Sequence, residues 1–516
     1  MKKITLLTFS AAIAVSACAQ QNPTAMKYAK LISAEDAKRH LSILASDEFE
    51  GRETGKPGAE KAANYIAAEF KKLGLLAPVK GSYFFDVPLE QNVLKVSAFT
   101  VNGKSFVLGQ DFFPNGTVPD NSIKAGDIVF VGFGTDSELG TTDLTGKVVL
   151  WINEDKPEAG KTANTAVRMS TARLQVLKKL QSKNPAIILA ANGELSNLLK
   201  RFGKSIASPR LTIKEGATAA KAVGVLHIST AIADELVKST GKTYADLKAA
   251  AATTPVVTAK ADFVADYAND HTDVKAVDVL GYMPGTDLKD EVLVFSAHYD
   301  HIGLESDPNA KDKVNNGADD DGSGTTGILE IARAFSQAKK DGHGPRRSVL
   351  FLGNVGEEKG LLGSEYYTDH PVYPLANTIT DLNVDMIGRV GEEYIGKPDS
   401  ANYVYSIGSA MLSKDLHDIG EKANDTYTKL KLDYKYDDPN DPNRFYYRSD
   451  HYNFAKHGVP IIFYFNGVHA DYHQPGDEVS KINFPLLAKR AQLVFYTGWE
   501  LANRDKKPAV DAVPSK

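Results

Sequence analysis

The stretch Val292-Leu293-Val294-Phe295-Ser296-Ala297-His298-Tyr299-Asp300 decides the fold. Its apolar beginning predicts a strand that is buried on both faces of a sheet, and this strand runs directly into a histidine and an aspartate. Three later segments repeat the arrangement: Val349–Gly353 before Gly356-Glu357-Glu358, Thr380–Val384 before Asp385, and Ile461–Phe465 before a loop with Tyr472-His473. Because ligands gather beyond the carboxyl ends of parallel strands, we expect these side chains to meet at one edge of the sheet.

Helices are predicted between these strands, at about Gly327–Lys339, Ser364–Tyr367 and Ser413–Asn424. Apolar strands that alternate with helices are typical of a mainly parallel sheet covered by helices on both faces. We therefore expect a three-layer α/β fold for this part of the chain.

A fifth polar element, Gly317-Ala318-Asp319-Asp320-Asp321-Gly322-Ser323-Gly324, lies before the first of these helices. Taken alone, the aspartates fit a solvated turn, and the pair Glu357-Glu358 fits a helix N-terminus. Taken together, five segments bring two histidines and at least three carboxylates to one edge of one sheet. Such a cluster is electrostatically unfavourable unless cations neutralise it, so the combined pattern indicates a metal site.

Two other motif interpretations of the glycine-rich segment fail. Gly322–Gly327 matches the spacing of a dinucleotide-binding loop, but no strand precedes it and aspartates stand where a pyrophosphate would approach. A serine-hydrolase elbow around Ser323 would need a glycine where Asp321 stands.

The composition limits the remaining classes of protein. The chain has 516 residues, 42% of them hydrophobic, and a formal net charge of -5, which predicts two or three domains and argues against a dedicated nucleic-acid binder. Cys18 is the only cysteine, so an intrachain disulfide and a metal site built from several cysteines are both excluded.

The N-terminus has the pattern of an export signal. Lys2 and Lys3 precede an uncharged apolar run, Ile4–Val15, that is too short to span a bilayer as a helix. Val15-Ser16-Ala17-Cys18 resembles a bacterial lipobox, which predicts a signal peptide over 1–18, a lipid on Cys18 and a polar tether over 19–30. Ordinary cleavage near Ala19 is the alternative. We expect a protein exported to the cell envelope that touches the membrane only through this anchor.

The pattern of predicted strands and helices changes twice along the chain. We expect a main domain in two parts, 31–122 and 265–506, with an α/β insert at 123–264 and a polar tail at 507–516. Residues 83–113 are predicted as short strands and turns. The insert contains a single histidine, His227, which lies in an apolar run and is interpreted as a hydrogen-bonded core residue.

At the polar motifs the sequence resembles peptidase family M28, the zinc aminopeptidases and their glutamate-carboxypeptidase relatives. The flanking segments Ser449-Asp450-His451 and Phe49-Glu50-Gly51-Arg52 agree with the resemblance, which extends from about residue 38 to 500. It implies the three-layer zinc-exopeptidase fold. The insert resembles, more loosely, a protease-associated domain.

Carried over to this sequence, the resemblance implies a centre with two zinc ions per chain. His298 and Asp385 would bind one ion, Glu358 and His473 the other, and Asp320 would bridge them. Asp300 would orient the imidazole of His298. Glu357 would be the general base, and Tyr472 would hydrogen-bond the oxyanion. The family register leaves His301, Asp319 and Asp321 as neighbours that are not ligands.

The implied activity is hydrolysis of peptides, with an aminopeptidase as the leading interpretation. Three alternatives remain open on the same fold: a glutaminyl cyclase with one zinc, a carboxypeptidase or dipeptidase, and a non-catalytic relative similar to the transferrin receptor. The oligomeric state, the side-chain preference and the role of the insert also stay open.

Overall fold

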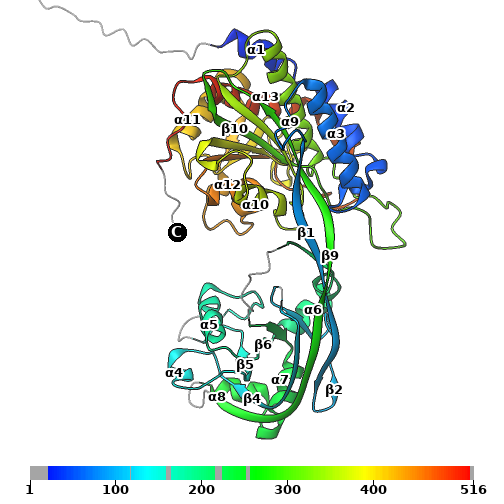
Figure 1. Ribbon diagram of the computed structural model, residues 1–516, viewed down its shortest axis with the longest axis vertical. Coiled ribbons are helices and arrows are strands. Elements are labelled where there is room, and N and C mark those ends of the chain that lie inside the picture. The colour runs from blue at the N-terminus through cyan, green and yellow to red at the C-terminus, as the bar shows by residue number, and fades with distance from the viewer. Residues whose placement is uncertain (1–20, 117, 158–163, 215–222, 252–255, 512–516) are drawn as a thin grey trace, which may run out of the picture. The chain divides into compact units, whose positions relative to one another are not determined.

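The computed structural model describes residues 21–116, 118–157, 164–214, 223–251 and 256–511 (Figure 1). Two compact units divide the chain: one holds the residues up to Pro88 together with Lys275 onward, and the other holds Leu89–Val274. The predicted signal peptide and Cys18 lie outside the described residues. Within the described ranges, no helix is long and apolar enough to cross a membrane.

The first unit contains the predicted parallel sheet. Strand β10 (Leu288–His298) lies between β11 (Arg347–Asn354) and β12 (Thr378–Val384) and is parallel to both. β15 (Ile461–Phe465) is parallel to β12. Antiparallel pairing occurs only towards the two edges among the described strands, where β13 (Tyr403–Ile407) pairs with β15 and the end of β9 (Val257–Met283) pairs with β11. A short strand, β14 (Lys431–Asp433), follows β13 at the edge.

Helices cover both faces of this sheet, which confirms the predicted three-layer fold. One layer packs around α9 and α13, and a smaller layer contains α10 and α12 (Figure 1). The bounds are α2 Ala34–Leu44, α3 Pro57–Leu73, α9 Gly322–Lys340, α10 Leu362–Asp369, α11 Lys414–Ala423, α12 His451–Lys456 and α13 Phe484–Asn503.

Helix ends follow the local sequence. The Ser33 side chain accepts a hydrogen bond from the Asp36 backbone N–H and so caps α2. Gly74 ends α3 with φ +83°, a left-handed conformation that glycine adopts without a steric cost. Residues 23–29, predicted as part of a tether, instead form helix α1 (Pro23–Ala29), because Asn22 caps it and Tyr28 is buried.

The second unit has its own mixed sheet. β4 (Asn121–Phe130), β5 (Val148–Ile152), β6 (Ile187–Ala191) and β8 (Val225–Ile228) are parallel neighbours, while β3 (Phe112–Pro114) and the first part of β9 close the two sides antiparallel. The remaining elements are β1 Phe84–Val101, β2 Lys104–Ser105, β7 Arg210–Ile213, α4 Asp136–Leu139, α5 Thr171–Ser182, α6 Leu195–Ile206, α7 Thr230–Val237 and α8 Tyr244–Ala250.

The edges of the second unit differ from the expected insert. The predicted boundaries at 123 and 264 both lie inside it, because most of β1 and more than half of β9 belong to this unit. β1 is also a single strand of 18 residues where short strands and turns were expected.

Candidate metal centre

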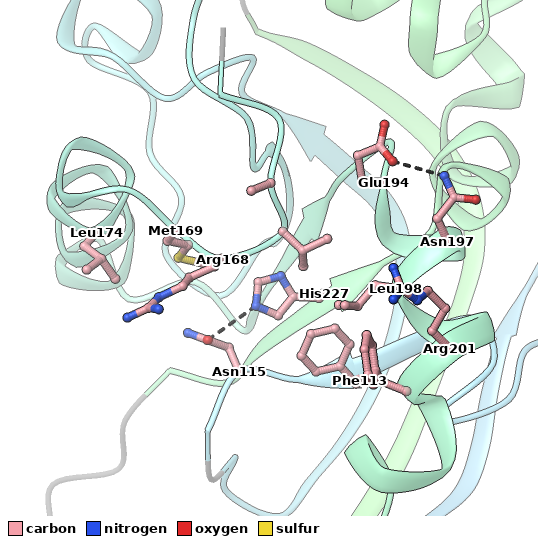
Figure 2. Close-up of a pocket in the computed structure, with 13 residues that line it drawn as sticks. Phe113, Asn115, Arg168, Met169, Leu174, Glu194, Asn197, Leu198, Arg201 and His227 are labelled. Carbon is pink, nitrogen blue, oxygen red and sulfur yellow. Dashed lines mark hydrogen bonds between the residues drawn. The ribbon is translucent and has the colours of Figure 1, made fainter. Parts of the chain in front are cut away.

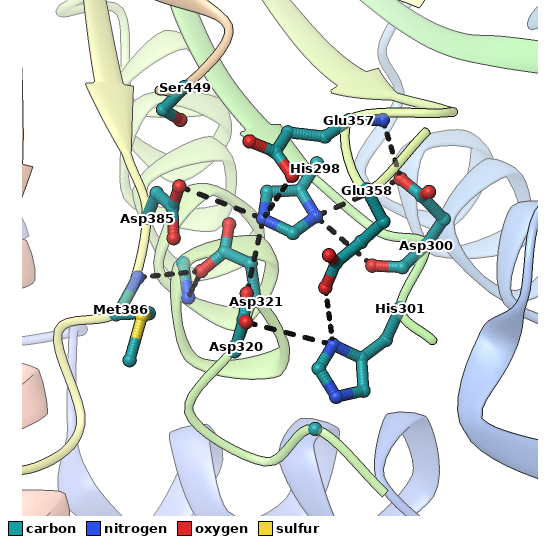
Figure 3. Close-up of polar contacts among 12 residues, drawn as sticks. His298, Asp300, His301, Asp320, Asp321, Glu357, Glu358, Asp385, Met386 and Ser449 are labelled. Atoms are coloured by element: carbon teal, nitrogen blue, oxygen red, sulfur yellow. Dashed lines mark hydrogen bonds and ion pairs between the residues drawn. The ribbon is translucent and has the colours of Figure 1, made fainter. Parts of the chain in front are cut away.

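The ends of neighbouring parallel strands bring the predicted site residues together, and Figure 3 shows those that follow β10, β11 and β12. His298 is the last residue of β10, and Asp300 lies two positions beyond it. Glu357 and Glu358 come after β11, Asp385 comes directly after β12, and His473 belongs to the loop after β15. Asp320 lies in the turn before α9. Since parallel strands end at the same edge, residues up to 175 positions apart meet in one cluster (473 − 298).

The first group of possible metal donors is His298, Asp320 and Asp385. Their ligand atoms all lie within 4.8 Å of one another, and all three residues are buried. Nε2 of His298 is 3.4 Å from Oδ1 of Asp320 and 3.7 Å from Oδ2 of Asp385. This nitrogen is buried without a hydrogen-bond partner among the described residues, so it is free to bind an ion.

A second donor group faces the other oxygen of Asp320. Nε2 of His473 lies 3.1 Å from Oδ2 of Asp320 and 3.2 Å from Oε2 of Glu358. Asp320 therefore presents Oδ1 to His298 and Oδ2 to His473, which is the arrangement that a bridging carboxylate requires.

His301 also enters this second group. Its Nδ1 is 2.7 Å from Oε1 of Glu358 and 3.8 Å from Oδ2 of Asp320, and its ring is fully buried. The sequence interpretation leaves His301 out of the ligand set, whereas the geometry offers it as a further donor. Its short contact is with Glu358 itself, so it also holds that carboxylate in place while the other oxygen faces His473.

Asp300 connects several parts of the centre, although not through the contact we expected. Nδ1 of His298 lies 3.0 Å from the backbone carbonyl of Asp300, but 3.7 Å from its carboxylate. That carboxylate accepts hydrogen bonds from the Thr54 hydroxyl at 2.6 Å and from the Glu357 backbone N–H at 3.2 Å. Asp300 thus orients the imidazole by its main chain and the Glu357 segment by its side chain.

The two aspartates beside Asp320 have structural contacts. Asp319 accepts hydrogen bonds from the Gly388 backbone N–H and the Ser323 hydroxyl, at 2.7 and 2.9 Å. Asp321 caps α9 through the Gly324 backbone N–H and also accepts from the Met386 backbone N–H. Both carboxylates tie the turn before α9 to the segment after β12.

Arg52 is a residue of the centre to which the sequence analysis gave no role. Its guanidinium is buried and donates to backbone carbonyls on both sides of the metal ligands. The acceptors are the carbonyls of Tyr299 and Leu44 at 2.8 Å each, Asn316 at 2.6 Å, Gly317 at 2.9 Å and Asp320 at 3.4 Å. In the sequence, the segment Phe49-Glu50-Gly51-Arg52 stood out only because it agrees with the family resemblance, and nothing in it indicated these hydrogen bonds.

Burial and the neighbouring charges shift the pKa values of the acids and histidines of the centre. Burial raises the pKa of Glu357 well above its usual range, and Glu358 and Asp385 add to this effect. Burial and Asp320 also raise the pKa of Glu358, but its close contacts with His301 and His473 outweigh them and hold it at about 2. Burial alone would lower the pKa of His473, but its contacts with Asp320 and Glu358 outweigh burial and raise this pKa to about 10. The cluster therefore attracts positive charge strongly.

A small cavity of about 30 Å³ adjoins the donor groups. Its walls combine Glu357 and Asp320 with apolar side chains, among them Met386, Phe445, Phe463 and Phe465. Tyr472 also lines it: the ring stacks on His473 at 3.9 Å between centroids, and its hydroxyl accepts a hydrogen bond from Arg448 at 3.1 Å.

Comparisons with known proteins match part of the chain to a peptidase family. Residues 278–498 match the model of Peptidase family M28. The aminopeptidase YwaD of Bacillus subtilis is 26% identical over a match that covers 46% of this chain and 47% of YwaD. A probable leucine aminopeptidase of Arthroderma otae is 29% identical over a match that covers 44% of this chain and 58% of that protein. The chain thus spans about half the length of these curated relatives. An aminopeptidase structure from Aneurinibacillus sp. strain AM-1 shares the fold, with a TM-score of 0.56, 18% identity, and coverage of 95% of this chain and 100% of that one.

Proposed function

Residues 278–498 match the model of peptidase family M28, and from this premise we propose that the protein is a zinc peptidase that removes residues from the N-termini of peptides. The observation that carries the proposal is Asp320, whose two oxygens face two separate donor groups. The names of the relatives support an aminopeptidase over the other peptidase activities.

The donor groups fit two zinc ions. Histidine nitrogens and carboxylate oxygens are ligands that zinc accepts, and buried atoms such as Nε2 of His298, Oδ2 of Asp320 and Nε2 of His473 have no hydrogen-bond partner among the described residues. His298 and Asp385 would hold one ion, Glu358 and His473 the other, with Asp320 between them. When bound, such a pair of ions supplies Lewis-acid activation of water and of the peptide carbonyl.

Glu357 is the general base in this proposal. Its carboxylate lies 3.8 Å from His298 and lines the cavity next to the donor groups, so it reaches the space where a water would attack the peptide bond. Its raised pKa suits a group that takes a proton from that water and returns it to the leaving amine.

Two neighbours assist this step. Asp300 holds the Glu357 backbone by its carboxylate and the His298 ring by its carbonyl. The Tyr472 hydroxyl borders the same cavity and can donate a hydrogen bond to the oxyanion that forms on the substrate.

The cavity has room for little more than a water molecule, but the apolar side chains around it favour a substrate with an apolar terminal residue. Phe445, Phe463 and Phe465 supply aromatic surface, and Met386 adds a flexible one. We therefore expect leucine or phenylalanine amides to be cleaved faster than aspartate or lysine amides.

We also propose that the protein is exported and attached to the cell envelope by a lipid on Cys18. The support is the sequence pattern Lys2-Lys3, Ile4–Val15 and the lipobox-like Val15–Cys18. Metabolic labelling with palmitate in a bacterial host tests this: the wild type should carry label in the membrane fraction, and Cys18→Ala should not. Label that persists in Cys18→Ala would contradict the anchor.

The decisive experiment for the activity is Glu357→Gln. We expect this variant to bind two zinc ions per chain, as the wild type does, while kcat falls by about 10²–10⁴-fold. Glu392→Gln, an exposed glutamate in the same unit, is the matched control and should keep full activity. Normal peptide hydrolysis by Glu357→Gln would show that another group is the base. One tightly bound zinc together with cyclisation of N-terminal glutamine would instead assign a glutaminyl cyclase.

A further inference from the structure

The second unit contains a pocket of about 680 Å³ that is made wholly of its own residues (Figure 2). Three segments supply the walls: Phe113 and Asn115 at the end of β3, the residues just before and within α5, and the exposed side of α6. His227 of β8 lies between them. Sites for small ligands have volumes of about 300–1,000 Å³, so this pocket can hold a ligand of several linked groups.

The floor of the pocket is flat and uncharged. The rings of Phe113 and His227 stack at 4.6 Å between centroids, and these residues are register partners in the β3–β8 pair. Nδ1 of His227 accepts a hydrogen bond from Asn153 at 3.2 Å, and Nε2 donates to Asn115 at 3.3 Å. Burial lowers the pKa of His227 to about 4, so the ring is neutral near pH 7.

The walls expose apolar surface to solvent. Leu174 and Phe202 line the pocket from α5 and α6 and are 45% and 47% exposed, although both are large apolar side chains. Val167, Met169 and Leu198 continue the same surface. Contiguous exposed apolar surface around a concave site is typical of a binding site.

Two arginines of the pocket have no anionic partner among the described residues, and the Glu194 carboxylate in the same lining accepts a hydrogen bond from Asn197 instead. Arg168 and Arg201 lie on either side of His227 and form no ion pair with any residue in the part of the chain that the structure describes. The Cζ atom of Arg201 lies 5.2 Å from the ring of Phe202, which keeps the guanidinium at the apolar wall. Nearby Arg173, by contrast, is buried and pairs with Asp155 at 3.0 Å. Free guanidinium groups beside apolar surface are complementary to a carboxylate on an apolar body.

We propose that this pocket binds the C-terminal end of a peptide with apolar side chains. Arg168 or Arg201, which lie on opposite sides of the pocket, receives the terminal carboxylate, and the apolar walls receive the last side chains. The amides of Asn115 and Asn197 favour a peptide over a fatty acid, because Nδ2 of Asn115 and Oδ1 of Asn197 form no hydrogen bond with a described residue and can pair with backbone groups. The site binds without cleaving and is independent of the metal centre.

Titration calorimetry of the full zinc-loaded protein with two blocked peptides tests the proposal. N-acetyl-Leu-Phe carries a free carboxylate, N-acetyl-Leu-Phe-amide does not, and neither has the free amine of an aminopeptidase substrate. We expect the acid to bind at least about tenfold more tightly than the amide, since a hydrogen-bonded charge pair distinguishes them. Decanoate should bind more weakly than the acid peptide, because it cannot use the asparagine amides.

Variants locate the binding. Arg168→Gln with Arg201→Gln should remove the preference for the acid, whereas Phe202→Ser should weaken acid and amide alike. Arg210→Gln is the matched control, since Arg210 is exposed in the same unit but outside this pocket, and it should bind as the wild type does. Equal affinity for acid and amide, tighter binding of decanoate, or an acid preference that survives the double arginine substitution would each overturn the proposal.

Discussion

The two units place parallel strands in the same way and differ in the residues at the carboxyl ends of those strands. In the first unit, β10, β11 and β12 lead into His298, Glu357 and Asp385, and several ligand atoms of this cluster are buried without a hydrogen-bond partner among the described residues. In the second unit, β5 and β6 lead into Asn153 and Asn192. The same position in a sheet therefore holds a cluster of unpaired metal-ligand atoms in the first unit and a network of hydrogen-bonded asparagines in the second.

The network of the second unit satisfies its own polar groups. Asn153 donates to His227 and to the Val167 carbonyl and accepts from Arg173, while Asn192 donates to the Asn153 carbonyl. Each of these buried donors has an acceptor close by, so no external charge is needed. The comparison shows that parallel strands bring side chains together at one edge of a sheet. Whether an ion binds there depends on whether the charged groups at that edge are left without partners.

The largest effect on this difference should come from Asp320→Asn, which removes the carboxylate shared by both donor groups. We expect zinc content to fall from two ions per chain to one or fewer and peptide hydrolysis to drop by more than the roughly 10–100-fold typical of losing an outer partner of a ligand. Metal analysis and hydrolysis of leucine amide measure this. Asp319→Asn, at a neighbouring carboxylate without a ligand role, should retain both ions; equal zinc loss in both variants would contradict the bridging assignment.

Zinc removal should separate the stability of the two units. The protein has two tryptophans, Trp499 in α13 of the first unit and Trp151 in β5 of the second, so Trp151→Phe and Trp499→Phe leave one reporter each. With zinc at about 1,000 times its Kd, chelation should cost the first unit about 4 kcal/mol of unfolding free energy. The Trp499 transition in urea should shift to lower concentration and the Trp151 transition should not. A shift of the Trp151 transition alone would contradict a metal centre in the first unit.

Asp300→Asn should have an intermediate effect. The substitution weakens the hydrogen bonds from Thr54 and from the Glu357 backbone but leaves the carbonyl that orients His298. We expect a loss of about 10–100-fold in kcat/KM with both zinc ions still bound at saturating metal. A variant that loses zinc before it loses activity would show that the Asp300 carboxylate mainly supports the ligand instead of the base.

A pH-dependent difference between the two units concerns the opposite pKa shifts of two histidines. The folded pKa of His473 is raised to about 10, whereas that of His227 is lowered to about 4 by burial. A lowered folded pKa contributes stability that is present above the unfolded value and is lost as pH falls, here between about 6.5 and 4. The second unit should lose up to about 3 kcal/mol over this range, measured by Trp151 fluorescence in urea.

His227→Gln should flatten this pH dependence, while His271→Gln, at an exposed histidine of the same unit, should leave it unchanged. A wild-type protein whose Trp151 transition does not move between pH 6.5 and 4 would contradict a neutral, buried His227.

Strong local patterns made much of the first unit predictable from the sequence. The strand at β10 and the helix Pro57–Leu73 with its Gly74 stop are encoded by apolar runs and end signals within a few residues. His298, Glu358 and Asp385 were noticed for the same reason, because each lies close to a predicted strand end, whereas the ligand roles, including that of Asp320 in the turn before α9, came from the family resemblance.

Features that depend on distant partners are not visible in the local sequence. β9 runs over 27 residues because it pairs with β4 in one unit and with β11 in the other, and no local signal shows both partners. The contact of His301 with Glu358 likewise joins residues 57 positions apart. The start of helix α13, in contrast to these features, does have a local signal. Asn483 caps it and Pro485 lies in its first turn.

The hydrogen bonds of Arg52 set a limit on where the active domain can be cut. The family match begins at residue 278, yet Arg52 holds the carbonyls of Tyr299, Asn316 and Gly317, and Thr54 holds the Asp300 carboxylate. A fragment of residues 278–498 would contain all the candidate ligands but none of these donors. During synthesis the ribosome releases Arg52 well over two hundred residues before His298 (298 − 52 = 246), so the hydrogen bonds of Arg52 around the centre can form only after the chain has been synthesised past residue 320.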